Sequence, residues 1–220
     1  EVLLLDQPFA SLDPPTRESL IVDVEQVLRR ARVTTIITTH DRSEALRLSS
    51  RIAVLGQGSI LQIDEPREVM YRPVDEFVAS FVGVETIVAG TVVRASEGCL
   101  TVAANGREIE AVGVAAAGEE VSLCIRPESV VLSREPFGVG TSVRNTLHGA
   151  IVKITTMGLY QKVLIECGFS LVAYLTNRSM QRMDLKEGQT INASFKATAV
   201  HVVRRKGSGQ TSSPALPTCR

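Results

Sequence analysis

The chain has 220 residues and no net formal charge at neutral pH. Hydrophobic residues make up 44% and charged residues 22%, which is ordinary for a soluble globular protein. No apolar run reaches the ~20 residues that a membrane-spanning helix needs. Aromatic residues make up 4% and tryptophan is absent, which argues against a base-stacking nucleic-acid surface.

Strand and helix patterns alternate over residues 1–80. The apolar run at 2–5 is typical of a strand buried on both faces, and the β-branched run at 33–38 predicts a second strand. Apolar spacing predicts helices at 16–32 and 42–49, and residues 51–64 predict a hairpin. This order of elements predicts a parallel α/β sheet.

From about residue 84 the pattern changes to short β-rich segments, which predicts small barrels or sandwiches. The segment "PFGVG" at 136–140 is typical of a linker, and the Ser/Pro/Gly-rich end is typical of a disordered tail. We therefore expect four regions, comprising residues 1–83, 84–136, 137–205 and 206–220.

The two β-rich regions resemble each other. At one constant offset, Val121 corresponds to Ile191 and Arg126 to Lys196, whereas upstream Gly90 corresponds to Gly149 at a shorter offset. The longer spacing within the second region is explained by an inserted short helix within 176–187. Two copies of one small barrel account for this pattern, and chance similarity between β sequences is the alternative.

Charge is unevenly distributed along the chain. Residues 137–205 carry nine basic and three acidic side chains, whereas residues 1–80 and 81–136 are each acidic. A basic module suggests an anionic ligand, although a solvated basic face explains the charge equally well. The four cysteines show no CxxC spacing, so we expect reduced thiols in a cytosolic chain rather than a zinc site or disulfide framework.

Asp6 ends the first predicted strand, where an open α/β sheet has its ligand crevice. A carboxylate there suits Mg²⁺, which prefers oxygen ligands, and a helix-capping aspartate is the alternative. The stretch "LLLDQPFASLD" at 3–13, followed by His40 at the end of the next strand, closely resembles the second nucleotide motif, D-loop and switch histidine of ABC-transporter ATPase subunits.

This resemblance implies roles for individual residues. Asp6 would hold Mg²⁺ on the nucleotide phosphates, and His40 would donate to the γ-phosphate. Gln7 stands where the family has a catalytic glutamate. An amide can orient water but cannot accept its proton, and losing a general base costs ~10²–10⁴ in rate. Gln7 is either a natural weakening or a substitution that traps a closed state. The loop that would meet a second ATPase subunit comprises Ser11, Leu12 and Asp13.

The family's P-loop, G-x-x-x-x-G-K-[ST], and its "LSGGQ" signature are absent from the sequence. We therefore expect the chain to correspond to the C-terminal part of an ATPase subunit and not to hydrolyse ATP alone. ATP and Mg²⁺ are expected cofactors of the intact subunit. The expected fold is a partial P-loop NTPase α/β domain followed by all-β OB-like or Mop-like barrels.

Residues 141–203 resemble the molybdate-binding, Mop-like module of some ABC ATPases, and residues 125–130 resemble the accompanying half of the same TOBE accessory region. The matching segments are "TSVRN" at 141–145, "LTNRS" at 175–179 and "SFKATAV" at 194–200. Val143 departs mildly from this pattern, because the family usually has a small residue there. The resemblance implies molybdate or tungstate as a regulatory ligand.

A tetrahedral dianion needs many hydrogen-bond donors and one or two cations. Arg144 and Lys196 would supply the charge. The remaining expected ligands are Ser142, Asn145, Thr176 and Ser179, the last near a helix N-terminus. Ordinary surface cations and turn residues are the alternative. Because the first β region has no counterpart to "SVRN", we expect a single site.

These features predict the C-terminal portion of the ATP-binding subunit of a molybdate/tungstate ABC importer. The implied partners are membrane-spanning permease subunits, a second ATPase subunit in a homodimer and, indirectly, a periplasmic or extracellular oxyanion-binding protein, with no nucleic acid. The implied location is cytoplasmic, at the inner face of the cell membrane. The alternatives are a non-enzymatic oxyanion-binding or storage protein, an ATPase subunit for sulfate, sugar or polyamine, and an inactive gene fragment.

Overall fold

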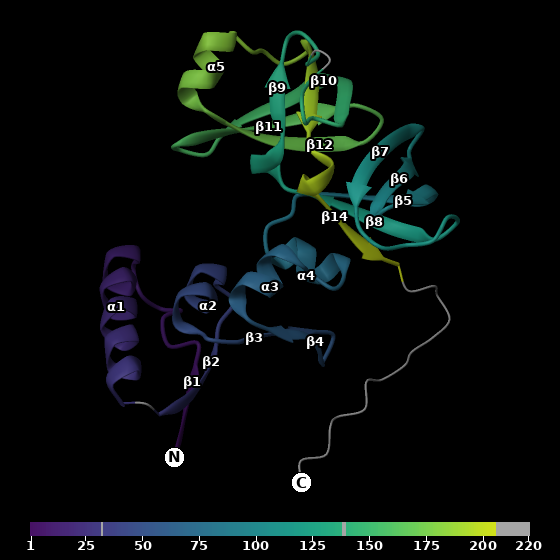
Figure 1. Cartoon of the computed structure of the whole chain (residues 1–220). Coiled ribbons are helices and arrows are strands. Elements are labelled where there is room, and N and C mark those ends of the chain that lie inside the picture. Colours follow the sequence, from purple (N-terminus) through teal and green to yellow (C-terminus); the bar gives the residue numbers. More distant parts are fainter. Residues whose placement is uncertain (32, 138–139, 206–220) are drawn as a thin grey trace. The chain divides into compact units, whose positions relative to one another are not determined.

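The computed structural model describes residues 1–31, 33–137 and 140–205, and the chain forms two compact units (Figure 1). The first unit comprises residues 1–83 and the second begins at Val84. The predicted tail at 206–220 and the centre of the predicted linker lie outside the described residues. None of the described helices combines the length and the apolar character that crossing a membrane requires.

The first unit alternates strand and helix as the sequence pattern predicts. β1 (Val2–Asp6) and β2 (Thr34–Thr38) pair in parallel, with Asp6 opposite Thr38. Two short helices after the hairpin were not predicted, and the Asp75 side chain caps the second by accepting from the Val78 amide at 2.8 Å. The other elements are α1 (Pro14–Ala31), α2 (Arg42–Leu48), the antiparallel hairpin β3 (Ile52–Gly56) and β4 (Ser59–Asp64), α3 (Pro66–Tyr71) and α4 (Glu76–Phe81).

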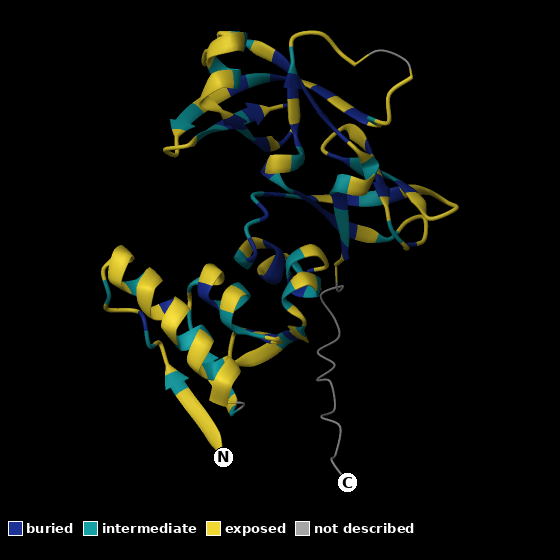
Figure 2. Cartoon of the chain, turned by 60° about the vertical axis from the view of Figure 1, so that its left-hand side comes forward, coloured by how far each residue is buried: buried dark blue, intermediate teal, exposed yellow. Residues whose placement is uncertain are grey.

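The prediction that β1 is buried on both faces was wrong. Leu4 is 70% exposed and Ile36 on β2 is 57% exposed, and Figure 2 shows both α1 and β1 largely as exposed surface. Within the described residues this sheet has two strands, and Ile21 is the buried residue of α1. The apolar run is of the kind that parallel sheets bury on both sides, but two strands and one helix do not cover both faces.

The second unit contains two five-stranded antiparallel sheets built from two equivalent sets of elements (Figure 1). We call residues 84–133 the first repeat and residues 143–204 the second repeat. The first repeat contains β5 (Thr86–Ser96), β6 (Cys99–Ala104), β7 (Arg107–Val112), β8 (Glu120–Ile125), the 3₁₀ helix η1 (Pro127–Ser129) and β9 (Val131–Ser133). The second repeat contains β10 (Asn145–Thr156), β11 (Tyr160–Glu166), β12 (Ser170–Thr176), α5 (Asn177–Met183), β13 (Thr190–Phe195), η2 (Ala197–Ala199) and β14 (Val200–Arg204).

The predicted internal repeat is confirmed at the level of single residues. Gly90 on β5 lies opposite Val121, and Gly149 on β10 lies opposite Ile191, as the predicted correspondence requires. A Cβ atom at Gly90 would meet the Ala103 carbonyl oxygen at 2.7 Å, and one at Gly149 would meet the Glu166 carbonyl oxygen at 2.5 Å. Both strands therefore need glycine where the neighbouring strand approaches closely.

The two repeats exchange their last strands. β9 of the first repeat pairs with β13 of the second, and β14 of the second repeat pairs with β8 of the first. The strand orders are β14-β8-β5-β6-β7 and β12-β11-β10-β13-β9. The expected boundaries at 84–136 and 137–205 stay a prediction about the sequence, but strand pairing crosses the boundary between them, so neither segment contains its complete sheet.

One hydrophobic core serves both sheets of the second unit. Buried side chains from both repeats, including Leu123 and Ile165, belong to one contiguous cluster, with Met180 and Met183 of α5 packed against it. The predicted inserted helix is therefore present as α5 and covers the core rather than projecting from it. Both repeats thus fold as parts of a single hydrophobic body.

Candidate functional site

The carboxyl ends of β1 and β2 meet at one edge of the parallel pair. The register that places Asp6 opposite Thr38 brings together the residues that follow each strand. The Thr38 hydroxyl donates to the Asp6 carboxylate. The backbone N–H of Gln7 donates to the backbone carbonyl of Thr38 at 3.0 Å. Parallel register, rather than sequence proximity, thus brings the predicted nucleotide residues to one edge.

Gln7 and His40 line the same small hollow at this edge, together with Arg17 and Glu44. Gln7 has a φ of +43°, a left-handed conformation that is uncommon for residues other than glycine and turns the chain sharply after β1. Its side chain can orient a water molecule, and His40 can donate or accept a proton. The hollow therefore brings the Gln7 amide and the His40 imidazole together, and their predicted roles at a nucleotide stay a prediction.

Asp6 fits the donor chemistry of Mg²⁺. It is an exposed carboxylate at the sheet edge, and the hydroxyl of Thr38 orients one of its oxygens. Among the described residues no group of three or more His, Cys, Asp and Glu side chains is placed to hold a metal. Asp6 can therefore be one oxygen ligand of an ion whose other ligands are water and phosphate.

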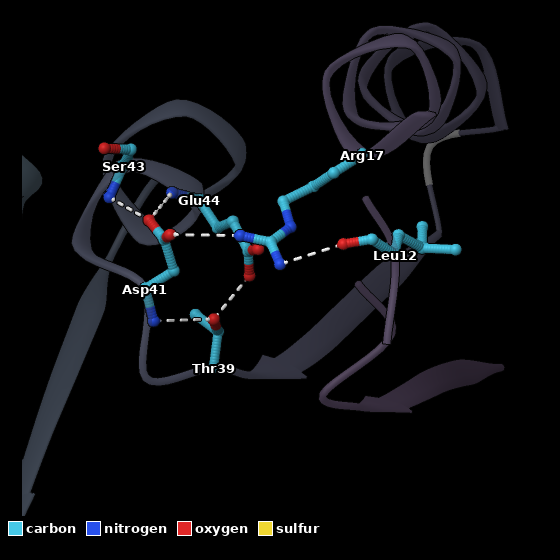
Figure 3. A network of polar contacts seen from close by, with 6 residues as sticks. All are labelled: Leu12, Arg17, Thr39, Asp41, Ser43 and Glu44. Atoms are coloured by element: carbon cyan, nitrogen blue, oxygen red, sulfur yellow. Dashed lines mark hydrogen bonds and ion pairs between the residues drawn. The ribbon is translucent and has the colours of Figure 1, made fainter. Parts of the chain in front are cut away.

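Arg17 connects the loop before α1 with the loop after β2 (Figure 3). Its guanidinium donates to the Leu12 carbonyl at 3.2 Å and lies 3.9 Å from the Asp41 carboxylate. Asp41 in turn caps α2 by accepting from the backbone amide of Ser43 at 2.7 Å and that of Glu44 at 3.2 Å. One side chain therefore links the predicted subunit-contact loop to the residue after His40.

The two other residues of this loop differ in what they do. Asp13 accepts from the Thr16 amide at 3.2 Å, and the hydrogen bonds from Thr16 lower the pKa of its carboxyl. This is the geometry of a helix cap at the start of α1. Ser11 is exposed, so its side chain is accessible for the contact that the sequence resemblance implies.

In the second unit, Arg144 and Lys196 lie at the same end of the second repeat. Asn145 is paired with Phe195, and continuing this antiparallel register by one position places Arg144 opposite Lys196. Residues directly opposite each other on antiparallel strands project to the same face. Both side chains are exposed, and neither forms an ion pair with any residue in the described part of the chain. We call this pair and Ser142 the Arg144 end.

Asn145 is not an exposed ligand, which corrects its assignment to the oxyanion site. Its side chain is 3% exposed, accepts from the Glu110 amide at 2.8 Å and donates to the Glu110 carbonyl at 2.9 Å. Thr86 makes the equivalent contact in the other direction, accepting from the Val172 amide at 3.0 Å. Asn145 and Thr86 therefore clamp the two repeats together.

Thr176 and Ser179 lie away from the Arg144 end within one chain, so their assignment to the oxyanion site stays a prediction. Thr176 pairs with Tyr160, which lies next to the C-terminal end of β10. Arg144 immediately precedes the N-terminal end of the same strand. The Thr176 hydroxyl caps α5 by accepting from the Ser179 amide at 3.1 Å and contacts the Ser179 hydroxyl at 2.9 Å. These two side chains start a helix and do not converge with Arg144 within one chain.

Sequence reasoning missed a second cluster of charged and polar residues in the same unit. Glu85, which precedes β5, accepts a hydrogen bond from the Tyr174 hydroxyl and forms an ion pair with Lys162. The alignment of the two repeats could have identified Glu85. The sequence offset that matches Gly90 with Gly149 also matches Glu85 with Arg144, a predicted ligand.

Comparisons with known proteins give a domain match for most of the second repeat and relatives for most of the chain. Residues 141–202 match the TOBE domain model. The chain is 34% identical to the molybdate/tungstate import ATP-binding protein WtpC of Pyrococcus abyssi, over 92% of this chain and 56% of the relative. The chain spans about half the length of the curated relatives that it matches.

Importers of other solutes are also similar. The sulfate/thiosulfate import ATP-binding protein CysA of Mycolicibacterium paratuberculosis is 31% identical, over 98% of this chain and 52% of the relative. The spermidine/putrescine import ATP-binding protein PotA of Thermotoga maritima is 31% identical, over 79% of this chain and 48% of the relative. Similarity at this level identifies import ATP-binding proteins as homologues and does not by itself select a solute.

Proposed function

We propose that this chain, a homologue of import ATP-binding proteins with a TOBE domain at residues 141–202, is the C-terminal portion of the ATP-binding subunit of a molybdate/tungstate ABC importer. The intact subunit would couple ATP hydrolysis to oxyanion uptake from the cytoplasmic side of the membrane. Its partners would be permease subunits, a second ATPase subunit and, indirectly, an external oxyanion-binding protein.

In this proposal the edge of the β1–β2 sheet is half of a nucleotide site. Asp6 holds Mg²⁺, His40 donates to the γ-phosphate, and residues 11–13 contact the second ATPase subunit. Mg²⁺ would supply charge neutralisation at the phosphates. Gln7 orients the attacking water without taking its proton, so hydrolysis is slow relative to a glutamate-bearing relative. The parallel register and the shared hollow of Gln7 and His40 support these roles.

The Arg144 end is the proposed oxyanion site, and the second unit is the regulatory domain that senses the imported ion. One observation carries this proposal: the strand register places two cations opposite each other, and neither has an acidic partner among the described residues. Like charges directly opposite each other on neighbouring strands are destabilising, and a dianion between them would remove that cost. Ser142 adds a hydroxyl donor next to Arg144.

Isothermal titration calorimetry of the full chain with molybdate, tungstate and sulfate tests the site. We expect one oxyanion per chain, and we expect Arg144→Ala and Lys196→Ala each to weaken binding by at least tenfold. Lys153→Ala, which removes an exposed cation elsewhere in the same unit, is the matched control and should leave the affinity unchanged. No heat with any of the three ions, or equal loss in the control, would overturn the proposal.

Sulfate import is the second candidate function. Sulfate is also a tetrahedral dianion, and a sulfate/thiosulfate import protein is among the relatives. The ranking of sulfate against molybdate in the same titration decides between them. A polyamine is a cation and would be repelled by Arg144 and Lys196, so spermidine should produce no heat.

A further inference from the structure

Glu85 lies inside a set of hydrogen-bond donors and cations from both repeats. Its carboxylate accepts from the hydroxyl of Tyr174 and pairs with the ammonium of Lys162, both from the second repeat. Continuing the pairing of Thr86 with Ile125 by one position places Arg126 of its own repeat opposite Glu85. The Glu85 side chain is 24% exposed and that of Lys162 is 35% exposed, so this contact is partly buried.

This cluster occupies the place that is equivalent to the Arg144 end. Glu85 corresponds to Arg144 and Arg126 corresponds to Lys196, and each of these two cross-strand sets lies one position beyond the last recorded pair of its ladder, Thr86 with Ile125 or Asn145 with Phe195. The partner repeat supplies a matching strand pair at each end. Lys162 is paired with Tyr174 at one end, and Cys99 is paired with Val112 at the other. We call Glu85, Arg126, Lys162 and Tyr174 the Glu85 end.

The equivalence of these strand pairs rests on two independent contacts. The close approaches at the two strand glycines align Ala103 with Glu166, and the same spacing carries Cys99 to Lys162. The clamps made by the Thr86 and Asn145 side chains align Glu110 with Val172, and the same spacing carries Val112 to Tyr174. Cys99 and Val112 are therefore the counterparts of the Lys162 and Tyr174 pair.

The two ends therefore differ in how the charge of their two cations is neutralised. Each end carries two cations, Arg144 with Lys196 or Lys162 with Arg126. Only the second contains a carboxylate between donors, and Glu128 lies 3.7 Å from Arg126 as a further acid. A carboxylate that accepts from an ammonium and a phenol uses the same donors that a tetrahedral oxyanion requires.

We propose that Glu85 acts as a built-in anion, whose carboxylate fills a second oxyanion site formed by Lys162, Tyr174 and Arg126 and excludes dissolved oxyanions from it. The class of ligand that this site would take without Glu85 is a tetrahedral dianion such as molybdate or sulfate. Lys162 and Tyr174 belong to this donor set by their contacts with Glu85, and Arg126 belongs to it by the continued strand register, while the parallel with the Arg144 end rests on the proposed function. The single-site binding expected above follows from this arrangement.

Removal of the carboxylate tests the proposal in the full chain. In equilibrium dialysis against molybdate, Glu85→Ala should bind one ion more than the wild-type chain. The double variant Glu85→Ala/Lys162→Met should lose that additional ion because its cation is gone. Glu108→Ala, which removes an exposed acid of the same repeat, makes the same change in net charge and should bind as the wild type does.

A further double variant separates this proposal from the proposed function. Glu85→Ala/Arg144→Ala should bind one molybdate even if the wild-type chain binds none at the Arg144 end. If the wild type fails to bind and this variant binds, the Arg144 site is wrong and the built-in anion stands. If Glu85→Ala is folded and binds no more molybdate than Glu108→Ala, the built-in anion is overturned.

Thermal unfolding provides a readout if Glu85→Ala is unstable. Without oxyanion the variant should melt roughly 5 °C below the wild type, because the Lys162 ammonium loses its carboxylate partner. Molybdate or sulfate should restore most of that loss, and chloride at matched ionic strength should not. Equal recovery with chloride would mean that screening alone is involved, and Glu85 would then be an ordinary ion-pair partner.

Discussion

The two repeats of the second unit share equivalent strands and carry opposite charge at one equivalent position. Gly118 and Gly188 both take left-handed φ angles, of +88° and +84°. Their backbone N–H groups donate to the carbonyls of Val92 on β5 and Ile151 on β10, at 2.7 and 2.8 Å, where the register of each strand shifts. Glu85 and Arg144, by contrast, share a position but not a charge. Backbone positions that the fold requires are retained between the copies, whereas this position at the end of the strand has diverged.

The contacts between the repeats are also equivalent where they are buried. Asn145 and Thr86 stand at equivalent positions and both hold the partner repeat by its backbone, one with two hydrogen bonds and the other with one. A buried amide and a buried hydroxyl differ in the number of bonds they can make but not in this purpose. The equivalence of the copies is therefore strongest in the interior and weakest at the two charged ends.

The largest expected effect tests whether the close strand approach is equally necessary in both copies. Gly149→Ala should lower the free energy of unfolding by about 3 kcal/mol, because the added methyl group meets a backbone oxygen that cannot rotate away. Gly90→Ala should cost nearly as much. Gly113→Ala is the control, since its nearest neighbour is a side-chain carbon at 3.3 Å, and urea denaturation provides the measurement.

The next effect concerns the two clamps. Asn145→Ala should cost about 2 kcal/mol, because it leaves a buried N–H and a buried C=O of Glu110 without their partner. Thr86→Ala leaves only the backbone N–H of Val172 without its partner and should cost about half as much. Molybdate affinity of the folded Asn145→Ala chain should match the wild type. A selective loss of affinity without loss of stability would return Asn145 to the ligand set.

The helix that distinguishes the second repeat gives a smaller effect. Thr176→Ala removes the side-chain cap of α5 and should cost about 1 kcal/mol in urea denaturation. Thr176→Asn retains a capping oxygen and should cost a few tenths at most. Neither variant should change the oxyanion stoichiometry, and a change in either would contradict the separation of α5 from the Arg144 end.

The smallest effect is the pH dependence contributed by Glu85. Burial alone would raise the pKa of this carboxyl, but the hydrogen bonds from Lys162 and Tyr174 outweigh it and hold the pKa below the ordinary value of 4.5. The contribution is therefore fully present above about pH 4.5 and is lost as the pH falls through the lowered pKa. Glu85→Gln should flatten the stability profile below this pH, and Glu108→Gln should not.

Local patterns in the sequence predicted the elements well, because periodicity and turn residues act over a few neighbouring positions. The parallel pairing of the first two strands, the inserted helix and the repeat all follow from such patterns. The exposure of β1 could not be predicted, since an apolar run specifies what it prefers to contact but not whether the chain provides it. The helices after residue 64 were missed because each has only six residues.

The candidate site was only partly predictable, for a physical reason that differs between its residues. Arg144 and Lys196 were chosen as the cations that a dianion needs, and their assignment stays a prediction. Asn145 was assigned to the ligand because sequence carries no direct signal of burial. Thr176 and Ser179 have the spacing of a helix cap, and the same hydroxyls were interpreted as ligands.

The exchange of β9 and β14 has a consequence for how the polypeptide matures on the ribosome. The edge of β8 that β14 covers remains bare until residues 200–204 leave the exit tunnel, although the rest of the first repeat has emerged well before. Unpaired strand edges are the surfaces through which nascent chains associate wrongly. The strand β14 thus completes the sheet of the first repeat. A chain that ends before β14 would therefore leave β8 of the first repeat unpaired, although that repeat is synthesised first.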